Sequence, residues 1–230
     1  MSNSNLVALT INSPNNSGKR THPIDRITPH CMAGQLSARK CGELFSRSSY
    51  QASSNYGIGT GGEIALYVPE SIRSWCSSSE SNDQRAVTIE CASDAKSPYA
   101  MNNKVYASLI RLCVDICRRN GKTKLLWLGD KSKTLKYTPK ADEMVLTVHR
   151  WFAAKSCPGD WLYCRLGELA QKVTAQLAGT EATTENKQEA KPEKLYHVYA
   201  QKGAFANKIN AEKLAADLTK TGQKVIILEE

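Results

Sequence analysis

Apolar and polar positions follow two different periods along the first 178 residues. Apolar residues recur at three- and four-residue steps over residues 101–120, and again from Asp160 to Gly179, which predicts two amphipathic helices. A shorter helix is predicted after Ser37, a residue type that caps helices. Alternating or continuous apolar runs predict strands at residues 6–11, 24–30, 55–59, 64–68, 85–92 and 125–128, and a strand or helix end at residues 144–148. Strands and helices therefore alternate through this region.

A change in pattern marks the end of this region. Residues 179–194 contain no large apolar residue and are interpreted as a linker between a domain at residues 1–178 and a tail at residues 195–230. The tail has a strand, helix, strand pattern at residues 195–201, 206–220 and 224–228, which predicts a small βαβ unit. A unit shorter than about 40 residues rarely buries enough surface to fold alone. We therefore expect it to pair with a second copy, which would give a homo-oligomer, or to dock on the first domain.

Composition excludes some classes of protein. Hydrophobic residues make up 41% and charged residues 23% of the chain, as in ordinary globular proteins. No apolar run approaches the length of about 18 residues that spans a bilayer, so no membrane span is predicted. The segment from Met1 to Ile11 lacks the basic and apolar regions of a secretory signal. Eight cysteines without such a signal favour reduced thiols, and Cys113 and Cys117 are predicted to be core residues.

Histidine and cysteine side chains near residue 150 indicate the chemistry. His149, Lys155 and Cys157 lie close together in the sequence, and His30 ends one of the predicted strands. An imidazole and a thiolate form a donor pair that suits Zn²⁺. We therefore expect His30, His149 and Cys157 to hold one zinc ion, with the remaining position open to water as in catalytic zinc sites. Cys31 is a possible competing ligand, but on a strand it is expected to point to the opposite face from His30.

Five segments together resemble the type-2 N-acetylmuramoyl-L-alanine amidases, a family that includes phage lysins and animal peptidoglycan recognition proteins. These segments are residues 28–34 (TPHCMAG), 54–64 (SNYGIGTGGEI), 73–75 (RSW), 86–90 (AVTIE) and 148–158 (VHRWFAAKSCP). They occur in the order found in the family and span about the first 175 residues. The resemblance implies an α/β fold with a central mixed β-sheet flanked by helices, in addition to the C-terminal βαβ unit.

The same resemblance implies roles for individual side chains. Glu90 is similar to the acidic residue of the family that takes a proton from the attacking water. Tyr56 and Lys155 would help to hold the oxyanion, and Trp75 would contact sugar or peptide at the border of the substrate groove. Members that lack the cysteine ligand bind peptidoglycan without cutting it, so the presence of Cys157 favours an enzyme.

The expected function is therefore a zinc-dependent hydrolase that cleaves the amide between N-acetylmuramic acid and L-alanine in bacterial cell walls. Without a signal peptide, the chain resembles a phage or prophage endolysin, which is made in the cytoplasm of its bacterial host and reaches the wall through a holin pore. Two alternatives stay open. One is a zinc-containing protein that binds peptidoglycan without turnover, and the other is a zinc peptidase that acts on a different amide.

The net charge suggests a third alternative function, a domain that binds nucleic acid. The net charge is +9, and residues 1–178 carry all of it, with 23 Lys and Arg against 14 Asp and Glu. Nucleic acid is one class of partner for such a surface, but no basic motif interleaved with aromatic residues is present, so a nucleic-acid partner is not expected. An anionic cell wall would attract the same charge over long range.

The tail has a resemblance of its own. The segments Gly203-Ala-Phe205 and Asn210-Ala-Glu-Lys-Leu214 resemble half of a sporulation-related (SPOR) repeat, which binds peptidoglycan. The second half of that repeat is missing. The resemblance implies that the tail binds the cell wall or forms an oligomer.

Overall fold

The computed structural model describes residues 2–179, 196–198, 203–205, 212 and 227–229. The chain divides into two compact units, Met1–Ala182 and Thr183–Glu230. Each unit is described below by itself. The first unit contains all the residues expected to carry the chemistry.

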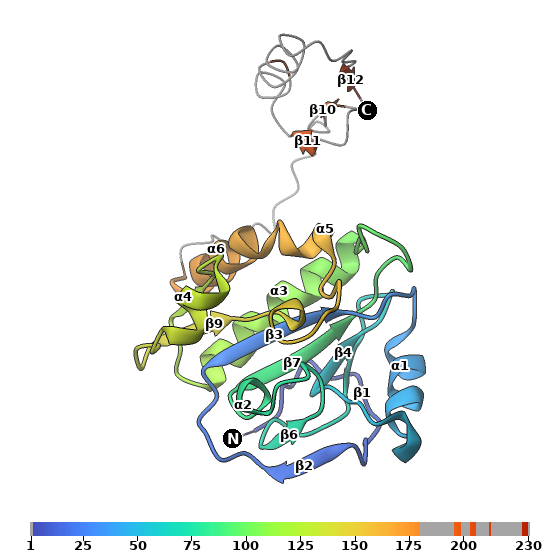
Figure 1. Ribbon diagram of the computed structural model, residues 1–230, viewed down its shortest axis with the longest axis vertical. Helices are drawn as coiled ribbons and strands as arrows, with labels where there is room; N and C mark the ends of the chain where they lie inside the picture. The colour runs from blue at the N-terminus through green and yellow to red at the C-terminus, as the bar shows by residue number, and fades with distance from the viewer. Residues whose placement is uncertain (1, 180–195, 199–202, 206–211, 213–226, 230) are drawn as a thin grey trace. The chain divides into compact units, whose positions relative to one another are not determined.

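The first unit is built on one seven-stranded sheet (Figure 1). Its strands, in spatial order, are β1 (Leu9–Thr10), β5 (Ile64–Leu66), β4 (Tyr56–Ile58), β7 (Ala86–Cys91), β3 (Arg26–Cys31), β9 (Glu143–Leu146) and β8 (Lys124–Leu126). All neighbouring pairs are parallel except β4 and β5, which form the predicted hairpin. The predicted central mixed sheet is therefore confirmed.

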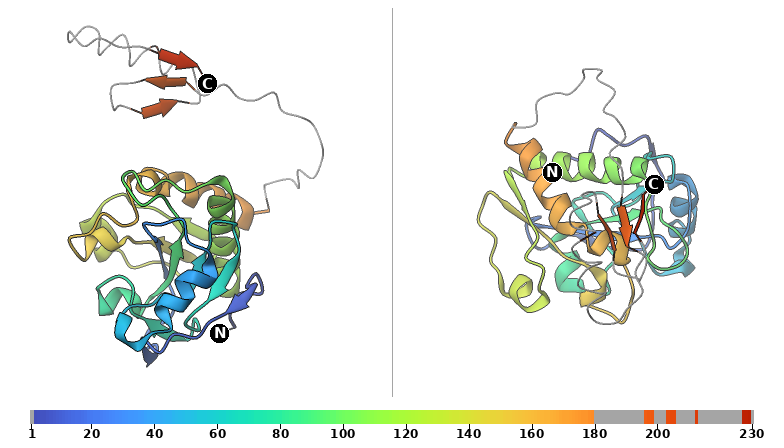
Figure 2. Two further views of the ribbon diagram at one scale, coloured as in Figure 1. Left: turned by 90° about the vertical axis from the view of Figure 1, so that its right-hand side faces the viewer. Right: turned by 90° about the horizontal axis from the view of Figure 1, so that it is seen from above.

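Helices cover the sheet on both faces. On one face, α3 (Asn103–Arg119) packs beside α6 (Leu166–Leu177), as Figure 2 shows from two further directions. The predicted apolar stripe of α3, including Cys113 and Cys117, lies in the main core together with Ile27 and Ile89 of the sheet. The helix ends at Arg119, and Gly121 follows two residues later with a φ of +67°, which suits glycine.

On the other face, α1 (Ala38–Phe45) covers β4 and β5 through a smaller core around Tyr67. The side chain of Ser37 caps this helix as predicted, because its Oγ accepts a hydrogen bond from the Lys40 N–H. Gly57 of β4 is required beneath this helix, since a Cβ there would lie 2.1 Å from the Tyr67 hydroxyl.

Several elements differ from the predictions. A two-stranded ladder of β2 (Asn16–Lys19) and β6 (Ile72–Ser74) was not expected, because neither strand has an apolar alternation. The helix α4 (Lys131–Lys136) lies in a segment interpreted as a basic loop; Asp130 caps it, but it has no apolar stripe. The helix predicted from Asp160 onward is two helices, α5 (Asp160–Tyr163) and α6.

The second unit contains a three-stranded antiparallel sheet in the order β11-β10-β12. These strands are β10 (Tyr196–Val198), β11 (Gly203–Phe205) and β12 (Ile227–Glu229). The predicted βαβ unit did not include β11, because a strand of three residues beginning with glycine gives almost no sequence signal. The helix predicted at residues 206–220 falls outside the described residues apart from Glu212, and the linker falls outside them apart from Gly179. The SPOR resemblance and the pairing with a second copy stay predictions.

The described residues also bear on membrane spans and on the state of the cysteine thiols. Within the described residues, no helix has the length and apolar character needed to cross a membrane. All eight cysteines belong to the described part of the chain, and their thiols are free.

Candidate metal centre

Two neighbouring strands position the first part of the site. β3 and β7 run parallel, and their register places His30 directly opposite Glu90. Residues in register on adjacent strands point to the same face, so these two side chains project together near the carboxyl ends of their strands. His30 is almost fully buried, at 1% exposed.

The segment after β9 supplies the remaining donors. His149 begins a short 3₁₀ helix, η2 (His149–Trp151), and Cys157 lies on the loop that follows. The Cys157 Sγ is 3.2 Å from the His30 Nδ1, and the rings of His30 and His149 have centroids 5.1 Å apart. One donor atom from each of the three residues lies within 4.8 Å of the other two. The structure thus brings together three residues that are up to 127 positions apart in the sequence.

The donor set fits zinc. Zn–S and Zn–N bonds of about 2.3 and 2.0 Å at tetrahedral angles separate the two donor atoms by about 3.5 Å. The observed separation of 3.2 Å between Cys157 and His30 is close to this value. Burial, together with the neighbouring His149, holds the pKa of His30 well below its usual range, so its imidazole is neutral and free to act as a ligand. The hydrogen bond to Cys31 and burial raise the pKa of Cys157, and a cation beside the thiol would favour the thiolate.

The carboxyl group of Glu90 lies close to the donor atom of His30. Its Oε1 is 3.9 Å from the His30 Nδ1 and 3.9 Å from the Cys76 Sγ. Its Oε2 is buried and has no hydrogen-bond partner among the described residues. Burial raises the pKa of Glu90 to about 8. A carboxyl group in this setting can both take up and release a proton near neutral pH.

Two loop residues, Cys76 and Ser78, also lie at the site. The hydrophobic pattern of the sequence did not predict either of them. Cys76 forms a second group of donors with His30 and Glu90, again within 4.8 Å of one another. Ser78 has a φ of +60°, and its Oγ lies 3.0 Å from the His149 Nε2. Both follow Trp75 in a polar loop, where sequence reasoning had singled out only the tryptophan.

The expectation for Cys31 is wrong. Its side chain hydrogen-bonds to Cys157 and lines the cavity that contains Glu90, so it does not point away from the site. Cys31 is the last residue of β3, and the chain turns at Ala33, whose φ is +49°. Strand alternation is therefore a poor guide to the direction of this side chain.

The expectation for Tyr56 is also wrong. Its register partner on β7 is Ile89, and the residue opposite Glu90 is Gly57, so Tyr56 points to the other face of the sheet. Its side chain is fully buried there. The hydroxyl donates to the Glu70 Oε1 at 2.5 Å and accepts from the Ser4 N–H at 2.9 Å. Tyr56 therefore has a structural role and no access to the metal donors.

Trp75 and Lys155 line the same cavity as His149, and their expected contacts with substrate stay predictions. Lys155 is exposed; burial and the charge of this lysine both lower the pKa of His149. The indole of Trp75 donates from Nε1 to the Ser17 Oγ at 2.6 Å. This hydrogen bond fixes the ring at the boundary between two cavities, both of which it lines.

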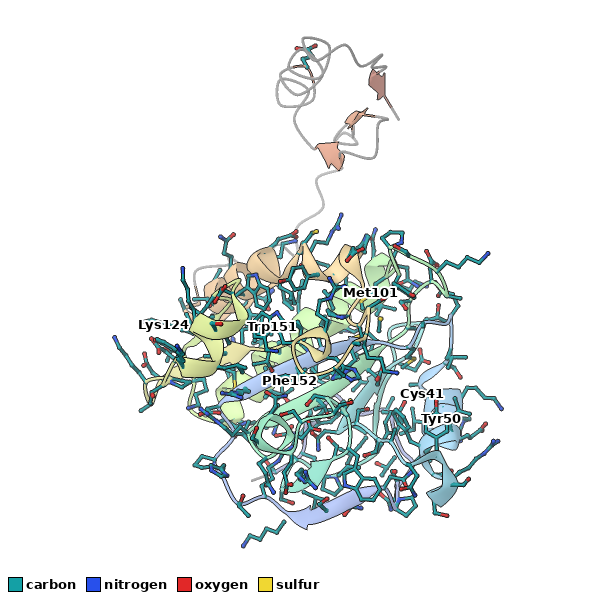
Figure 3. All side chains as sticks on the ribbon, viewed as in Figure 1. Cys41, Tyr50, Met101, Lys124, Trp151 and Phe152 are labelled. Carbon is teal, nitrogen blue, oxygen red and sulfur yellow. The ribbon has the colours of Figure 1, made fainter. Side chains whose placement is uncertain are left out.

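These two cavities differ in chemistry. The apolar cavity, of about 210 Å³, lies between His149, Glu90 and the α1 side, where Leu44, Phe45 and Tyr50 line it; Tyr50 and the nearby Cys41 are labelled in Figure 3. The polar cavity, of about 410 Å³, is lined by Arg73, Ser78 and Lys155 in addition to His149. Glu80 and Asp83 also line the polar cavity. A substrate lying over the candidate metal donors would therefore meet an apolar surface on one side and a surface with charges of both signs on the other.

The sequence also matches a known protein family. Residues 20–160 match the family model described as N-acetylmuramoyl-L-alanine amidase. No curated protein sequence matches the chain.

Solved structures with a similar fold include a mutant endolysin from Bacillus subtilis, which is 17% identical, covers 73% of this chain and 99% of its own, and has a TM-score of 0.48. The endolysin N-acetylmuramoyl-L-alanine amidase LysCS from Clostridium intestinale URNW is 15% identical, with coverages of 75% and 97% and a TM-score of 0.46. Drosophila peptidoglycan recognition protein SD is 18% identical, with coverages of 69% and 92% and a TM-score of 0.46. Because these TM-scores are low, the sequence match alone carries the assignment to a family.

Proposed function

Because this chain belongs to the N-acetylmuramoyl-L-alanine amidase family, we propose that it is a zinc-dependent hydrolase that acts on the peptidoglycan of bacterial cell walls. Family membership gives the amidase activity and its substrate. The bond cleaved is the amide between N-acetylmuramic acid and L-alanine. The observation that carries the zinc dependence is the convergence of His30, His149 and Cys157 within 4.8 Å.

His30, His149 and Cys157 would hold the ion. When bound, zinc supplies a Lewis acid that polarises the carbonyl and lowers the pKa of the attacking water. The neutral imidazole of His30 needs no deprotonation to act as a ligand, since burial already holds its pKa low. Ser78 hydrogen-bonds to His149 and orients its ring.

Glu90 moves the proton. Its partnerless Oε2 is available to accept the proton of the attacking water. The same carboxyl group then delivers this proton to the nitrogen of the departing L-alanine. Its raised pKa, which results from burial, suits this second step because the group must hold a proton near neutral pH.

Side chains around the donors orient the substrate. Lys155 brings a positive charge to the border of the polar cavity, where it stabilises negative charge on the carbonyl oxygen. Trp75 offers the edge of its ring to both cavities and suits contact with a sugar or a peptide. The apolar cavity accommodates methyl groups of the lactyl and alanyl parts of the substrate.

The biological setting follows from the substrate. We propose that the enzyme is an endolysin of a phage or prophage that degrades the wall of its host. Synthesis in the host cytoplasm and release through a holin pore stay predictions from the sequence. The basic first unit favours approach to an anionic wall, since its whole charge excess lies in residues 1–178.

Digestion of purified peptidoglycan tests this function. The zinc-loaded protein should release stem peptides with free L-alanine amino termini, identified by mass spectrometry. His30→Ala should lose both the metal and this release. Glu90→Gln should retain the metal but lower the rate by about 10²- to 10⁴-fold, the usual contribution of a general acid–base residue.

Glu43→Gln is the matched control for Glu90→Gln. Glu43 lies on the exposed side of α1, and among the described residues its carboxylate pairs with Lys40 alone, so this variant should keep the rate of the unmodified protein. Cleavage of another amide would instead identify a zinc peptidase. Binding to the wall without any new amino termini would identify a non-catalytic zinc protein.

A further inference from the structure

A third cavity opens on the same face of the sheet as the metal donors. It has a volume of about 580 Å³ and lies where β3 and β7 begin, with Arg26 and Arg85 in its lining. Arg26 precedes His30 by four residues on β3, which places the cavity about 13 Å along the strand from the donors. Lys131 adds to the positive charge, and none of the described residues that line this basic cavity is acidic.

Arg26 is the unusual residue in this lining. Its side chain is 5% exposed, and its guanidinium donates from Nη1 to the Asn82 Oδ1 at 3.2 Å. Among the described residues, no carboxylate forms an ion pair with it. Burial and the nearby charge of Arg85 lower the pKa of Arg26 to about 10. The charge of Asp25, which is itself paired with Arg85, raises the pKa of Arg26 by a smaller amount. A buried charge that has only a shared counter-charge is costly, and a bound anion would add a partner.

The surrounding charges leave the cavity positive. Arg85 is paired with Asp25, whose Oδ1 accepts from the Arg85 Nε at 2.8 Å. Lys131 is exposed at the start of α4 and has no ion pair with any described residue. The carboxylate of Asp25 therefore offsets only one of the three positive charges, which belong to Arg26, Arg85 and Lys131.

Neutral groups in the lining suit a phosphate ester better than a simple ion. Ser79 and Ser81 add hydroxyl groups beside the guanidinium groups, a combination that binds phosphate oxygens well. Trp151 and Phe152, labelled in Figure 3, form an aromatic wall that can contact a glycerol or sugar unit. The volume exceeds that of a phosphate group, so there is room for the unit that carries it.

This cavity adjoins the catalytic groove. Ser78 and Ser79 line both the basic cavity and the polar cavity, which contains Lys155 and His149. Trp151 and Phe152 follow His149 directly in the chain. A polymer attached to the substrate could therefore occupy the basic cavity while the scissile amide lies at the metal donors.

We propose that the basic cavity binds a phosphate group of an anionic phosphodiester polymer attached to the peptidoglycan. The identity of the carrier rests on the proposed function, whereas the anion site itself rests only on the cavity. A flexible chain of small units fits an open recess of this size. Duplex nucleic acid would instead need an extended basic track on the surface.

Binding of a short poly(glycerol phosphate) oligomer to the full zinc-loaded chain tests the proposal. Lys131→Gln should weaken binding about tenfold, the effect of losing one charge-assisted contact. Arg26→Gln should weaken it at least as much, with circular dichroism as a check on folding. Lys133→Gln is the matched control, because Lys133 lies two residues further along α4, is equally exposed and does not line the cavity. Since Lys131 is exposed, its variant remains informative even if Arg26→Gln does not fold.

Two further probes distinguish the sources of phosphate. Inorganic phosphate should compete with the oligomer but bind more weakly, and a DNA oligonucleotide should show no dependence on Lys131. Equal oligomer binding by the Lys131→Gln and Lys133→Gln variants would overturn the proposal. So would binding of inorganic phosphate without binding of the oligomer, or DNA binding that weakens with Lys131→Gln as much as oligomer binding does. Because binding is read without turnover, a failure of the amidase activity would leave this result interpretable.

Discussion

At the scale of single residues, the site depends on the direction in which each side chain points. His30 and Glu90 share a face because they are register partners on parallel strands. Tyr56 lies one residue from the partner of Glu90, and this single step turns it to the opposite face. Its hydroxyl completes a buried cluster with Glu70 and Ser4.

Tyr56→Phe distinguishes a structural role of this tyrosine from a catalytic one. We expect the variant to keep its zinc content and kcat, because the ring stays in the core and the site is untouched. Its free energy of unfolding should fall by about 1–2 kcal/mol, since Glu70 and the Ser4 N–H each lose a buried hydrogen-bond partner. Urea denaturation and peptidoglycan digestion measure the two effects.

Tyr137→Phe serves as the comparison for this prediction. The Tyr137 hydroxyl also bonds to a carboxylate, that of Glu143, but close to the surface, so the loss of stability should be smaller. A large drop in the kcat of Tyr56→Phe with unchanged stability would show that this tyrosine has a catalytic role.

The sequence allowed the metal donors to be predicted because histidine and cysteine are few and have specific chemistry. His30, His149 and Cys157 meet as expected. Tyr56 and Cys31 were misplaced because a resemblance or a strand pattern does not determine register or the exact strand end. Cys76 and Ser78 were missed because a polar loop has no period, and its path depends on contacts such as the bonds from the Cys76 and Ser77 N–H groups to Asp83.

At the scale of elements, a buried ion pair ties α3 to the loop after β5. Arg119 near the end of α3 donates from Nη2 to the Glu70 Oε1 at 2.6 Å and from Nη1 to Oε2 at 3.0 Å. Glu70 is fully buried, so its carboxylate depends on this bidentate contact and on Tyr56.

Arg119→Met should therefore lower the free energy of unfolding by about 3–5 kcal/mol, the cost of leaving one member of a buried pair without its partner. Thermal or urea denaturation measures this loss. Arg118→Met is the control on the same helix, because Arg118 is exposed and bonds only to the Gln176 carbonyl. Similar stabilities for the two variants would show that Glu70 does not depend on Arg119.

Long periodic elements were predictable and short ones were not. The apolar stripe of α3 defines a helix of 17 residues within the predicted bounds. By contrast, β2, β6 and α4 are short and polar, and local hydrogen bonds such as the Asp130 cap hold them in place. Such elements depend on their neighbours in space, which the sequence does not reveal directly.

At the scale of the whole molecule, charge and chemistry lie in the first unit. Residues 1–178 carry the entire excess of +9 and the three candidate metal donors. The second unit contributes a separate antiparallel sheet. This division predicts that catalysis and attachment to the wall can be separated.

Truncation after Gly179 tests that division. We expect the shortened chain to keep its zinc and its rate on a soluble muramoyl peptide, while its affinity for purified walls falls and any oligomer dissociates. Co-sedimentation with walls and light scattering after gel filtration measure the last two properties. Unchanged wall affinity and oligomeric state would remove the role assigned to the tail.

The central claim is that His30, His149 and Cys157 hold a catalytic zinc ion, and a zinc titration tests it most directly. The chelated protein is supplied with increasing zinc while the release of L-alanine amino termini from peptidoglycan is measured. We expect release to be lost on chelation and to be restored in proportion to zinc, reaching a plateau at about one ion per chain, the stoichiometry of a single three-donor site. Release that continues unchanged after complete removal of metal would contradict it.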